Sequence, residues 1–201
     1  MNIPIDKDTS LVLFERTQTV ELFHLVSYNH DHLKNWERWI RNLNTLAATQ
    51  YFIDQNQRLF EKLSNTEGIS GNHPGFQLGI LHEGKIIGLA GYQGLRLTDH
   101  SCALGYWIDQ RWEGQGFVTR SCRTLVDYAF SKLEMNRIEI QCSVDNGRSQ
   151  KVAERLGFAQ EARLAEVEFS NGQYIDHYLY RLLRREWNEQ SRVYSIDDRH
   201  M

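Results

Sequence analysis

The chain has 201 residues, of which 41% are hydrophobic and 24% are charged, and its net charge at neutral pH is -3. This length and composition suit one ordinary globular domain with a sizeable core. The near-balanced charge argues against a general nucleic-acid binder, which carries a basic excess. No apolar run approaches the about 18 residues that a membrane span needs, and the polar residues 1–8 lack the features of a signal peptide. We therefore expect a cytoplasmic protein with no nucleic-acid or membrane partner.

The cysteines and histidines give no support for a metal or disulfide framework. Cys102, Cys122 and Cys142 are odd in number and lack the spacing of paired zinc ligands. His30-Asp31-His32 resembles a metal pair, but no third ligand is evident, and a solvated break between helices explains it as well. The sequence predicts that the protein binds no metal.

The first half of the chain predicts a strand, two helical regions and a β-hairpin. The first helical region carries apolar residues at spacings of three, four and seven, and the residues around Asn29-His30-Asp31 interrupt it. The hairpin turn is Glu83-Gly84, and the glycine-rich stretch Glu67–Gly75 is predicted as a loop before it. In chain order the expected elements are strand Leu11–Phe14, helical region Thr19–Ile40, helix Leu46–Leu63, strand Phe76–His82 and strand Lys85–Gln93.

The second half predicts strands that alternate with helices and then a final hairpin. Asn171-Gly172 between two alternating runs is a strong hairpin signal. The expected elements are strand Cys102–Ile108, helix Phe117–Leu133, strand Arg137–Val144, helix Ser149–Leu156, strand Ala162–Ser170 and strand Gln173–Leu182. This order predicts a mixed α/β sheet in one domain over residues 1–186, followed by a polar tail over residues 187–201.

The sharpest local signal is the segment Arg111-Trp112-Glu113-Gly114-Gln115-Gly116, which lies between a predicted strand and a predicted helix. The free backbone N–H groups and the dipole at such a helix N-terminus favour an anion such as a pyrophosphate. Glycines let the backbone approach phosphate oxygens, and Arg111 would add a charge-assisted contact. On spacing alone, an ordinary strand-to-helix turn remains an equal interpretation.

Two stretches together resemble the signature of GNAT acyltransferases. Gly105-Tyr106-Trp107-Ile108-Asp109 followed by Arg111-x-x-Gly114-x-Gly116 is similar to the [Q/R]xxGx[G/A] motif of that family. Asn146-x-x-Ser149 followed by Leu156-Gly157-Phe158 is similar to its second motif. The resemblance covers roughly residues 11–183 and is strongest over 104–158. It implies an α/β GNAT fold with about seven strands, splayed between the fourth and fifth, and about four flanking helices.

Within that superfamily the chain resembles the RimJ/RimL-type branch of ribosomal-protein N-terminal acetyltransferases. The Gly-Tyr-Trp-Ile strand end, the pair Trp36 and Trp39, and the hairpin from Glu168 to Asp176 carry this likeness. It implies a homodimer and an acceptor that is the α-amino group of a protein N-terminus, such as that of a ribosomal protein. A small amine acceptor (a polyamine, an amino acid or an aminoglycoside) and a non-catalytic acyl-CoA-binding module remain alternatives.

The resemblance implies acetyl-CoA as the acyl-donor cosubstrate, held in the splay of the sheet. The N–H of Ile108 is expected to donate to the oxyanion of the reaction. Asn146 is expected to bind the pantetheine arm, although it also suits a simple turn. The expected cofactor-binding residues are Trp107, Ile108, Asp109, Arg111, Trp112, Glu113, Gly114, Gln115, Gly116, Phe117, Val118, Thr119, Asn146 and Ser149.

Transfer to an amine needs a base, because an ammonium group has no lone pair with which to attack. The resemblance implies that Glu168 is this base and that Ser149 protonates the departing thiolate. Glu166 would share a strand face with Glu168 if the strand were regular, so it stays a second candidate for the base or for acceptor binding. Two purely structural interpretations remain open. Glu166 and Glu168 can be read as solvated carboxylates of the hairpin, and Ser149 as the N-cap of a helix.

Trp36 and Trp39 are the expected acceptor-site residues on the first helical region. Their spacing of three places them on one helix face. They either form a wall of the acceptor pocket or pack in the core.

Overall fold

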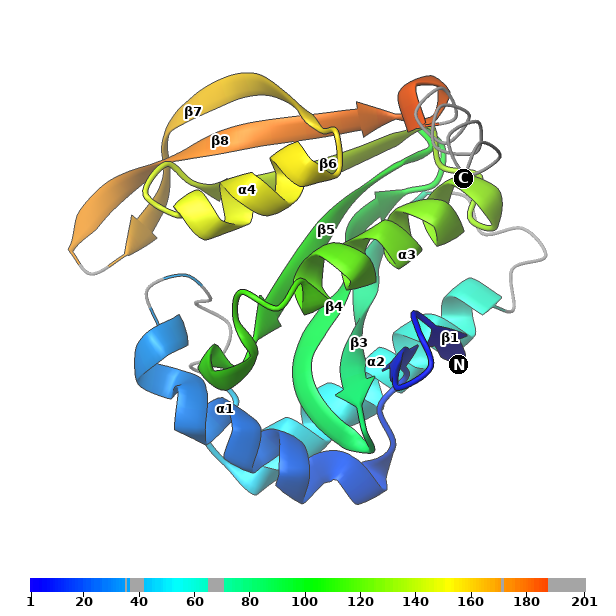
Figure 1. Ribbon diagram of the computed structural model, residues 1–201, viewed down its shortest axis with the longest axis vertical. Helices are drawn as coiled ribbons and strands as arrows, with labels where there is room; N and C mark the ends of the chain where they lie inside the picture. The colour runs from blue at the N-terminus through cyan, green and yellow to red at the C-terminus, as the bar shows by residue number, and fades with distance from the viewer. Residues whose placement is uncertain (35, 37–41, 65–70, 171, 188–201) are drawn as a thin grey trace, which may run out of the picture.

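The computed structural model describes residues 1–34, 36, 42–64, 71–170 and 172–187. Its centre is one mixed sheet of eight strands in the order β1-β2-β3-β4-β5-β6-β8-β7 (Figure 1). All neighbouring pairs are antiparallel except β5 and β6, which are parallel. The strands are β1 Asn2–Pro4, β2 Thr9–Val12, β3 Asn72–His82, β4 Lys85–Arg96, β5 Ser101–Ile108, β6 Arg137–Ser143, β7 Ala159–Ser170 and β8 Gln173–Leu183.

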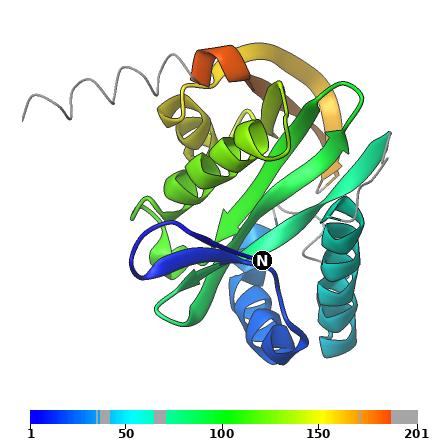
Figure 2. The same ribbon diagram turned by 90° about the vertical axis from the view of Figure 1, so that its right-hand side faces the viewer.

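Helices cover both faces of this sheet (Figure 2). One face carries α1, Thr19–Leu33, and α2, Leu46–Ser64; the opposite face carries α3, Phe117–Ser131, and α4, Gly147–Arg155. Two short 3-10 turns, η1 Arg16–Gln18 and η3 Gln110–Trp112, precede α1 and α3. Two buried clusters lie mainly on opposite faces, because side chains alternate along regular strands, and α2 also packs Leu59, Phe60 and Leu63 against the larger cluster. We call the two faces of the sheet the α1/α2 face and the α3/α4 face.

The structure corrects three boundaries predicted from the sequence. The sheet has eight strands rather than about seven, because Asn2–Pro4 pairs with β2 as an additional edge strand. Residues 72–75, predicted as loop, open β3, since β4 extends to Arg96 and pairs with them. The buried Asn29 does not break α1, because its amide donates to the Leu25 carbonyl and its Oδ1 accepts from the Gln110 N–H.

The two ends of the predicted domain also differ in detail. The helix α1 ends at Leu33, and most of the expected helical region beyond it lies outside the described residues. At the other end, residues 184–187 form a helical turn. Trp187, assigned to the polar tail, is only 5% exposed, and its indole N–H donates to the Asp127 carboxylate at 2.7 Å. The rest of the expected tail lies outside the described residues.

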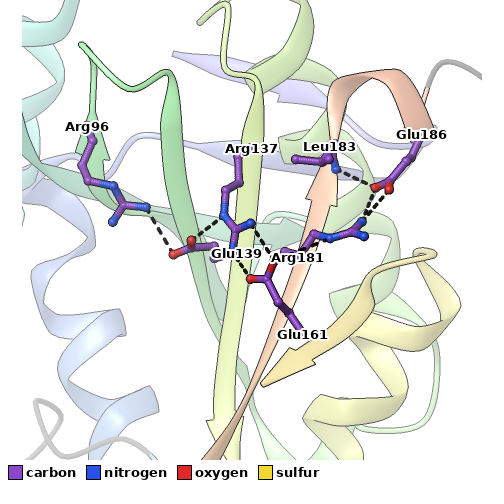
Figure 3. A network of polar contacts seen from close by, with 7 residues as sticks. All are labelled: Arg96, Arg137, Glu139, Glu161, Arg181, Leu183 and Glu186. Atoms are coloured by element: carbon purple, nitrogen blue, oxygen red, sulfur yellow. Dashed lines mark hydrogen bonds and ion pairs between the residues drawn. The ribbon is translucent and has the colours of Figure 1, made fainter. Parts of the chain in front are cut away.

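The predicted splay between the fourth and fifth expected strands is confirmed as the gap between β5 and β6. These strands pair only from Ser101 opposite Arg137 to Ala103 opposite Glu139, and they diverge beyond that point. Charged side chains from β4, β6, β7 and β8 tie the paired end together (Figure 3). Glu139 accepts from Arg137 at 2.7 Å and from Arg96 at 3.3 Å, while Arg137 also binds Glu161. The closed end of the gap is therefore held by backbone pairing and by shared ion pairs.

Candidate active site

A cleft of about 870 Å³ opens where β5 and β6 diverge. Its walls come from the ends of α1, α3 and α4, from the diverging strands and from the β7–β8 hairpin. Among the described parts of the chain, no helix is long and apolar enough to cross a bilayer. The predicted site residues can be placed around this cleft.

The predicted phosphate turn forms one end of the cleft. Gly114 and Gly116 have φ values of +75° and +79°, which lie in the region that favours glycine. Gly116 is the N-cap of α3, so no cap side chain accepts from the first amides of the helix. Residues 117–119, which carry those amides, line the cleft. This end can therefore receive an anion at the positive end of the helix dipole.

All the expected cofactor-binding residues line the cleft except Asp109, Arg111 and Gln115. The Asp109 carboxylate is fully buried and binds the Arg111 guanidinium, with Nε to Oδ2 at 2.9 Å. The same guanidinium lies over the Tyr28 ring, 4.3 Å from its centroid. Burial alone would raise the pKa of Asp109, but the hydrogen bonds from Arg111 outweigh it and lower that pKa. Arg111 thus holds the turn through Asp109, and its contact with a phosphate stays a prediction.

The other end of the phosphate turn is joined to two helices through Glu113. One Glu113 oxygen lies 2.8 Å from His32 Nε2 of α1, and the other binds Arg148 of α4. All three side chains line the cleft. Sequence analysis missed this cluster, because its members lie 81 and 35 positions apart.

The N-terminus of α4 brings Ser149 to the cleft. The helix begins at Gly147, two residues earlier than expected, and Asn146 is its N-cap, accepting from the Ser149 N–H at 3.1 Å. The interpretation of Ser149 as the N-cap is therefore wrong. Its hydroxyl instead lies 2.9 Å from the Tyr106 hydroxyl of β5. Tyr106 is a site residue that the sequence analysis did not single out, although its alternation with Trp107 would have placed it on the α3/α4 face.

Glu168 enters the cleft from β7, on the opposite face of the sheet from Ser149. Its side chain is 18% exposed, and its Oε2 lies 3.1 Å from Nε2 of His177 on β8. Nδ1 of the same imidazole lies 3.1 Å from the amide nitrogen of Gln141 on β6. When that amide donates to Nδ1, Nε2 carries the proton and donates to the Glu168 carboxylate. His177 is a second residue that the sequence analysis missed.

Glu166 does not share the face of Glu168, because β7 is not regular between them. Leu164 pairs with His177 and Glu168 with Ile175, so three residues of β7 stand opposite the single residue Asp176. In a regular strand Glu166 would lie opposite Ile175. Instead it has a φ of +52°, is exposed, and donates its N–H to the Asp176 carboxylate at 2.9 Å. The bulge brings Glu168 to the cleft and leaves Glu166 outside it.

A family model described as "Acetyltransferase (GNAT) domain" matches residues 14–159 of the chain. The chain belongs to the GNAT acetyltransferase family. It is therefore an acetyl-CoA-dependent N-acetyltransferase, and the family and fold expected from the two motifs are confirmed. The motif residues lie at the diverging strands and helix starts that line the cleft.

Several relatives match this GNAT chain over most of its length. A putative ribosomal N-acetyltransferase YdaF of Bacillus subtilis is 29% identical over 184 residues, covering 91% of this chain and 95% of the relative. A ribosomal-protein-serine acetyltransferase of Escherichia coli is 26% identical and covers 89% and 94%. Among solved structures, RimL, the ribosomal L7/L12 alpha-N-protein acetyltransferase, in complex with coenzyme A superposes with a TM-score of 0.83. It is 22% identical and covers 91% of this chain and 98% of that one, so it shows the shared fold.

The acceptor side of this GNAT cleft is described only in part. Trp36 is 40% exposed and lines the cleft, so it is not a core residue. Trp39, its expected partner on the helix face, lies outside the described residues. Within the described ranges, no three His, Cys, Asp or Glu side chains are grouped to hold a metal. His32 of the histidine pair bonds Glu113 instead.

Proposed function

We propose that the protein transfers the acetyl group of acetyl-CoA to the α-amino group of a protein N-terminus, such as that of a ribosomal protein. The observation that carries this proposal is the position of Glu168. Its carboxylate faces the same cleft as the edge of β5 and as Ser149, but from the opposite face of the sheet. An amine between them would have a proton acceptor on one side and the donor thioester on the other. The relatives named for ribosomal N-acetylation match nearly the whole chain, which supports the choice of acceptor.

The residues that would hold acetyl-CoA fit its chemistry. The α3 amides and the two left-handed glycines offer uncapped donors for the pyrophosphate. Asp109 donates its N–H to the Ile87 carbonyl of β4 at 2.8 Å. Backbone groups alternate along a strand, so the N–H of Ile108 points to the other edge, into the gap. That N–H would donate to the thioester carbonyl oxygen as negative charge develops on it.

The proton path runs through Glu168. The amine must lose a proton as its nitrogen bonds the carbonyl carbon, and the Glu168 carboxylate would accept that proton. The His177 N–H would keep the carboxylate oriented, and Gln141 would hold the imidazole in the tautomer that donates to it.

The leaving group would take its proton from the opposite face. As the carbon–sulfur bond breaks, the Ser149 hydroxyl would donate to the thiolate sulfur. The Tyr106 hydroxyl would in turn donate to Ser149 across their 2.9 Å contact. The products are then an N-acetylated acceptor and the free thiol of CoA. Glu168 releases the proton of the amine to water and the Tyr106–Ser149 pair regains one from water, so both sides return to their starting states.

The test is an acetyl-transfer screen that offers N-terminal peptides, polyamines, free amino acids and aminoglycosides in parallel. We expect efficient turnover of peptides with a free α-amino group and none of the same peptides with a blocked N-terminus. Efficient turnover of a small amine with none of any peptide would overturn the proposed acceptor class.

We further propose that the chain works as a homodimer in the cytoplasm, where new protein N-termini are made. The basis is its likeness to the RimJ/RimL-type branch. Sedimentation at tens of micromolar tests the dimer, and a single monomeric species would contradict it.

A further inference from the structure

A second cavity, of about 420 Å³, lies between α2 and strands β3 and β4 on the α1/α2 face. Asn42 and Gln93 line both this cavity and the cleft, so the two spaces adjoin. We call it the amide pocket. Its remaining lining residues are Leu43, Ala48, Tyr51, Phe52, Gln55 and Gln77.

The pocket floor is made of two glutamines that lie over two glycines. Gly91 of β4 pairs with Gly105 of β5. A Cβ added to Gly105 would lie 2.1 Å from Gln93 Nε2, and one added to Gly91 would lie 2.2 Å from the Phe76 carbonyl oxygen and 3.0 Å from Gln77 Cδ. The Gln93 amide therefore occupies the space that a side chain at Gly105 would fill, and the Gln77 amide lies beside Gly91. They give the sheet surface neutral donors and acceptors beside the cleft.

Apart from the polar Asn42 and Gln55, the walls of the pocket are apolar or aromatic, and its lining within the described residues contains no charged side chain. Moving an ionised group into such a site without a partner is costly, whereas an uncharged side chain gains from burial. Main-chain amides of a peptide can bond with the glutamine amides at the same time. A polyamine or an aminoglycoside, which carries further ammonium groups, would find no carboxylate among the described residues that line the pocket.

The position of the pocket matches the reach of a peptide. Gly105, Trp107 and Gln93 lie on the same face of the sheet as His177 and Glu168, since the register pairs odd-numbered residues across β4, β5, β6 and β8. Gly105 is three residues before Ile108 on β5, a distance of about 10 Å along a strand. The second and third residues of an extended acceptor, with their side chains, span that distance when the α-amino group lies near Ile108.

We propose that the amide pocket receives an uncharged side chain from the second or third residue of the acceptor peptide and so selects which N-termini are acetylated. This inference rests on the proposed function, because it takes the acceptor to be a peptide. The pocket then acts as a specificity site that is separate from the proton-transfer groups.

The test compares peptides that differ only in the second and third residues, carrying Leu or Asp there, with a single amino-acid amide that is too short to reach the pocket. Ala48→Trp fills the pocket from α2, and Ala47→Trp is the matched control, since Ala47 is an exposed neighbour outside both linings. Tyr51→Ala removes one wall of the pocket, and the fold should tolerate it because Tyr51 is 66% exposed. This variant tests the pocket without depending on how a tryptophan fits into it.

For the unchanged protein we expect the Leu peptides to exceed the Asp peptides in kcat/KM by about tenfold or more. Ala48→Trp should erase this preference by raising KM for the Leu peptides, and Tyr51→Ala should weaken it. Neither variant should change turnover of the amino-acid amide, and Ala47→Trp should change nothing. If kcat/KM for peptides depends neither on their second and third residues nor on Ala48→Trp, this inference alone is overturned. Turnover of polyamines with none of any peptide would overturn it together with the proposed function.

Discussion

The two ends of the gap between β5 and β6 use their polar side chains in different ways. At the closed end, Glu139 and Arg137 each bind two charged partners, and these pairs link β6 to β4 and to β7 within one sheet. At the open end, Glu168 and Ser149 face the cleft from opposite sides of the sheet. The stability of the sheet and the catalytic chemistry therefore depend on different side chains, because the groups that hold the strands together are not those that face a ligand.

The sharpest test of this separation is Glu168→Gln, which removes the proposed base and keeps the shape of the side chain. We expect kcat to fall by about 10²–10⁴-fold, while the Kd for acetyl-CoA and the melting temperature stay nearly unchanged. Glu166→Gln is the matched control, because Glu166 lies outside the cleft lining. Full activity of Glu168→Gln across pH 6 to 9, measured by initial rates, would remove Glu168 from this role.

A second test addresses the phosphate turn at the open end. Gly114→Glu would place a side chain and a negative charge where the pyrophosphate is expected, so we predict a Kd for acetyl-CoA raised by about 100-fold or more. Gly84→Glu is the control, since Gly84 has a φ of +77° in the β3–β4 turn and does not line the cleft. Calorimetry on both variants separates the effect of backbone strain at a positive φ from the effect of blocking the phosphate site. Equal losses of affinity would mean that backbone strain alone is responsible.

The closed end should respond in stability rather than in catalysis. Arg137→Met removes the guanidinium shared by Glu139 and Glu161, but Arg96 and Arg181 still face these carboxylates. We therefore expect a loss of about 1 kcal/mol, or a melting temperature lower by about 2–4 °C, with kcat/KM unchanged. Arg16→Met, which breaks one exposed pair with Asp54, should cost less. A large fall in kcat of Arg137→Met with no change in stability would contradict the assignment of the closed end to stability alone.

The smallest effect concerns Asp109 under the phosphate turn. Its pKa is lowered in the folded protein, so its contribution to stability is complete above the unfolded-state pKa, about 3.9, and is lost as the pH falls through the folded-state value. We expect Asp109→Asn to flatten this acidic part of the stability curve, measured by denaturant unfolding between pH 3 and 7. An unchanged slope would show that Asp109 has the same pKa in both states.

Much of the fold could be predicted because its signals are local. The turn at Gly114 and Gly116, the helix that follows and the Asn171-Gly172 hairpin each lie in one short stretch of sequence. The bulge in β7 could not be predicted, since it depends on Asp176 of the next strand accepting from Glu166 and on Arg163 pairing with the same carboxylate. Two-residue alternation would have put Glu166 and Glu168 on one face, and only the pairing register separates them.

The site clusters that sequence analysis missed share the same physical cause. His177 meets Glu168 across two strands, and Tyr106 meets Ser149 across 43 positions of sequence. A histidine or tyrosine in a strand carries no local mark of its partner, so such pairs become visible only when the sheet is assembled.

The placement of the tryptophans has an optical consequence. Of the five in the chain, Trp36, Trp107 and Trp112 line the cleft, and the first is far more exposed than the second. Trp187 is buried against α3, outside the cleft lining, with its indole bonded to Asp127. Intrinsic fluorescence from the cleft should therefore change in intensity and colour as ligands enter, while the emission of Trp187 stays constant. The protein carries its own unlabelled reporter of occupancy together with an internal reference.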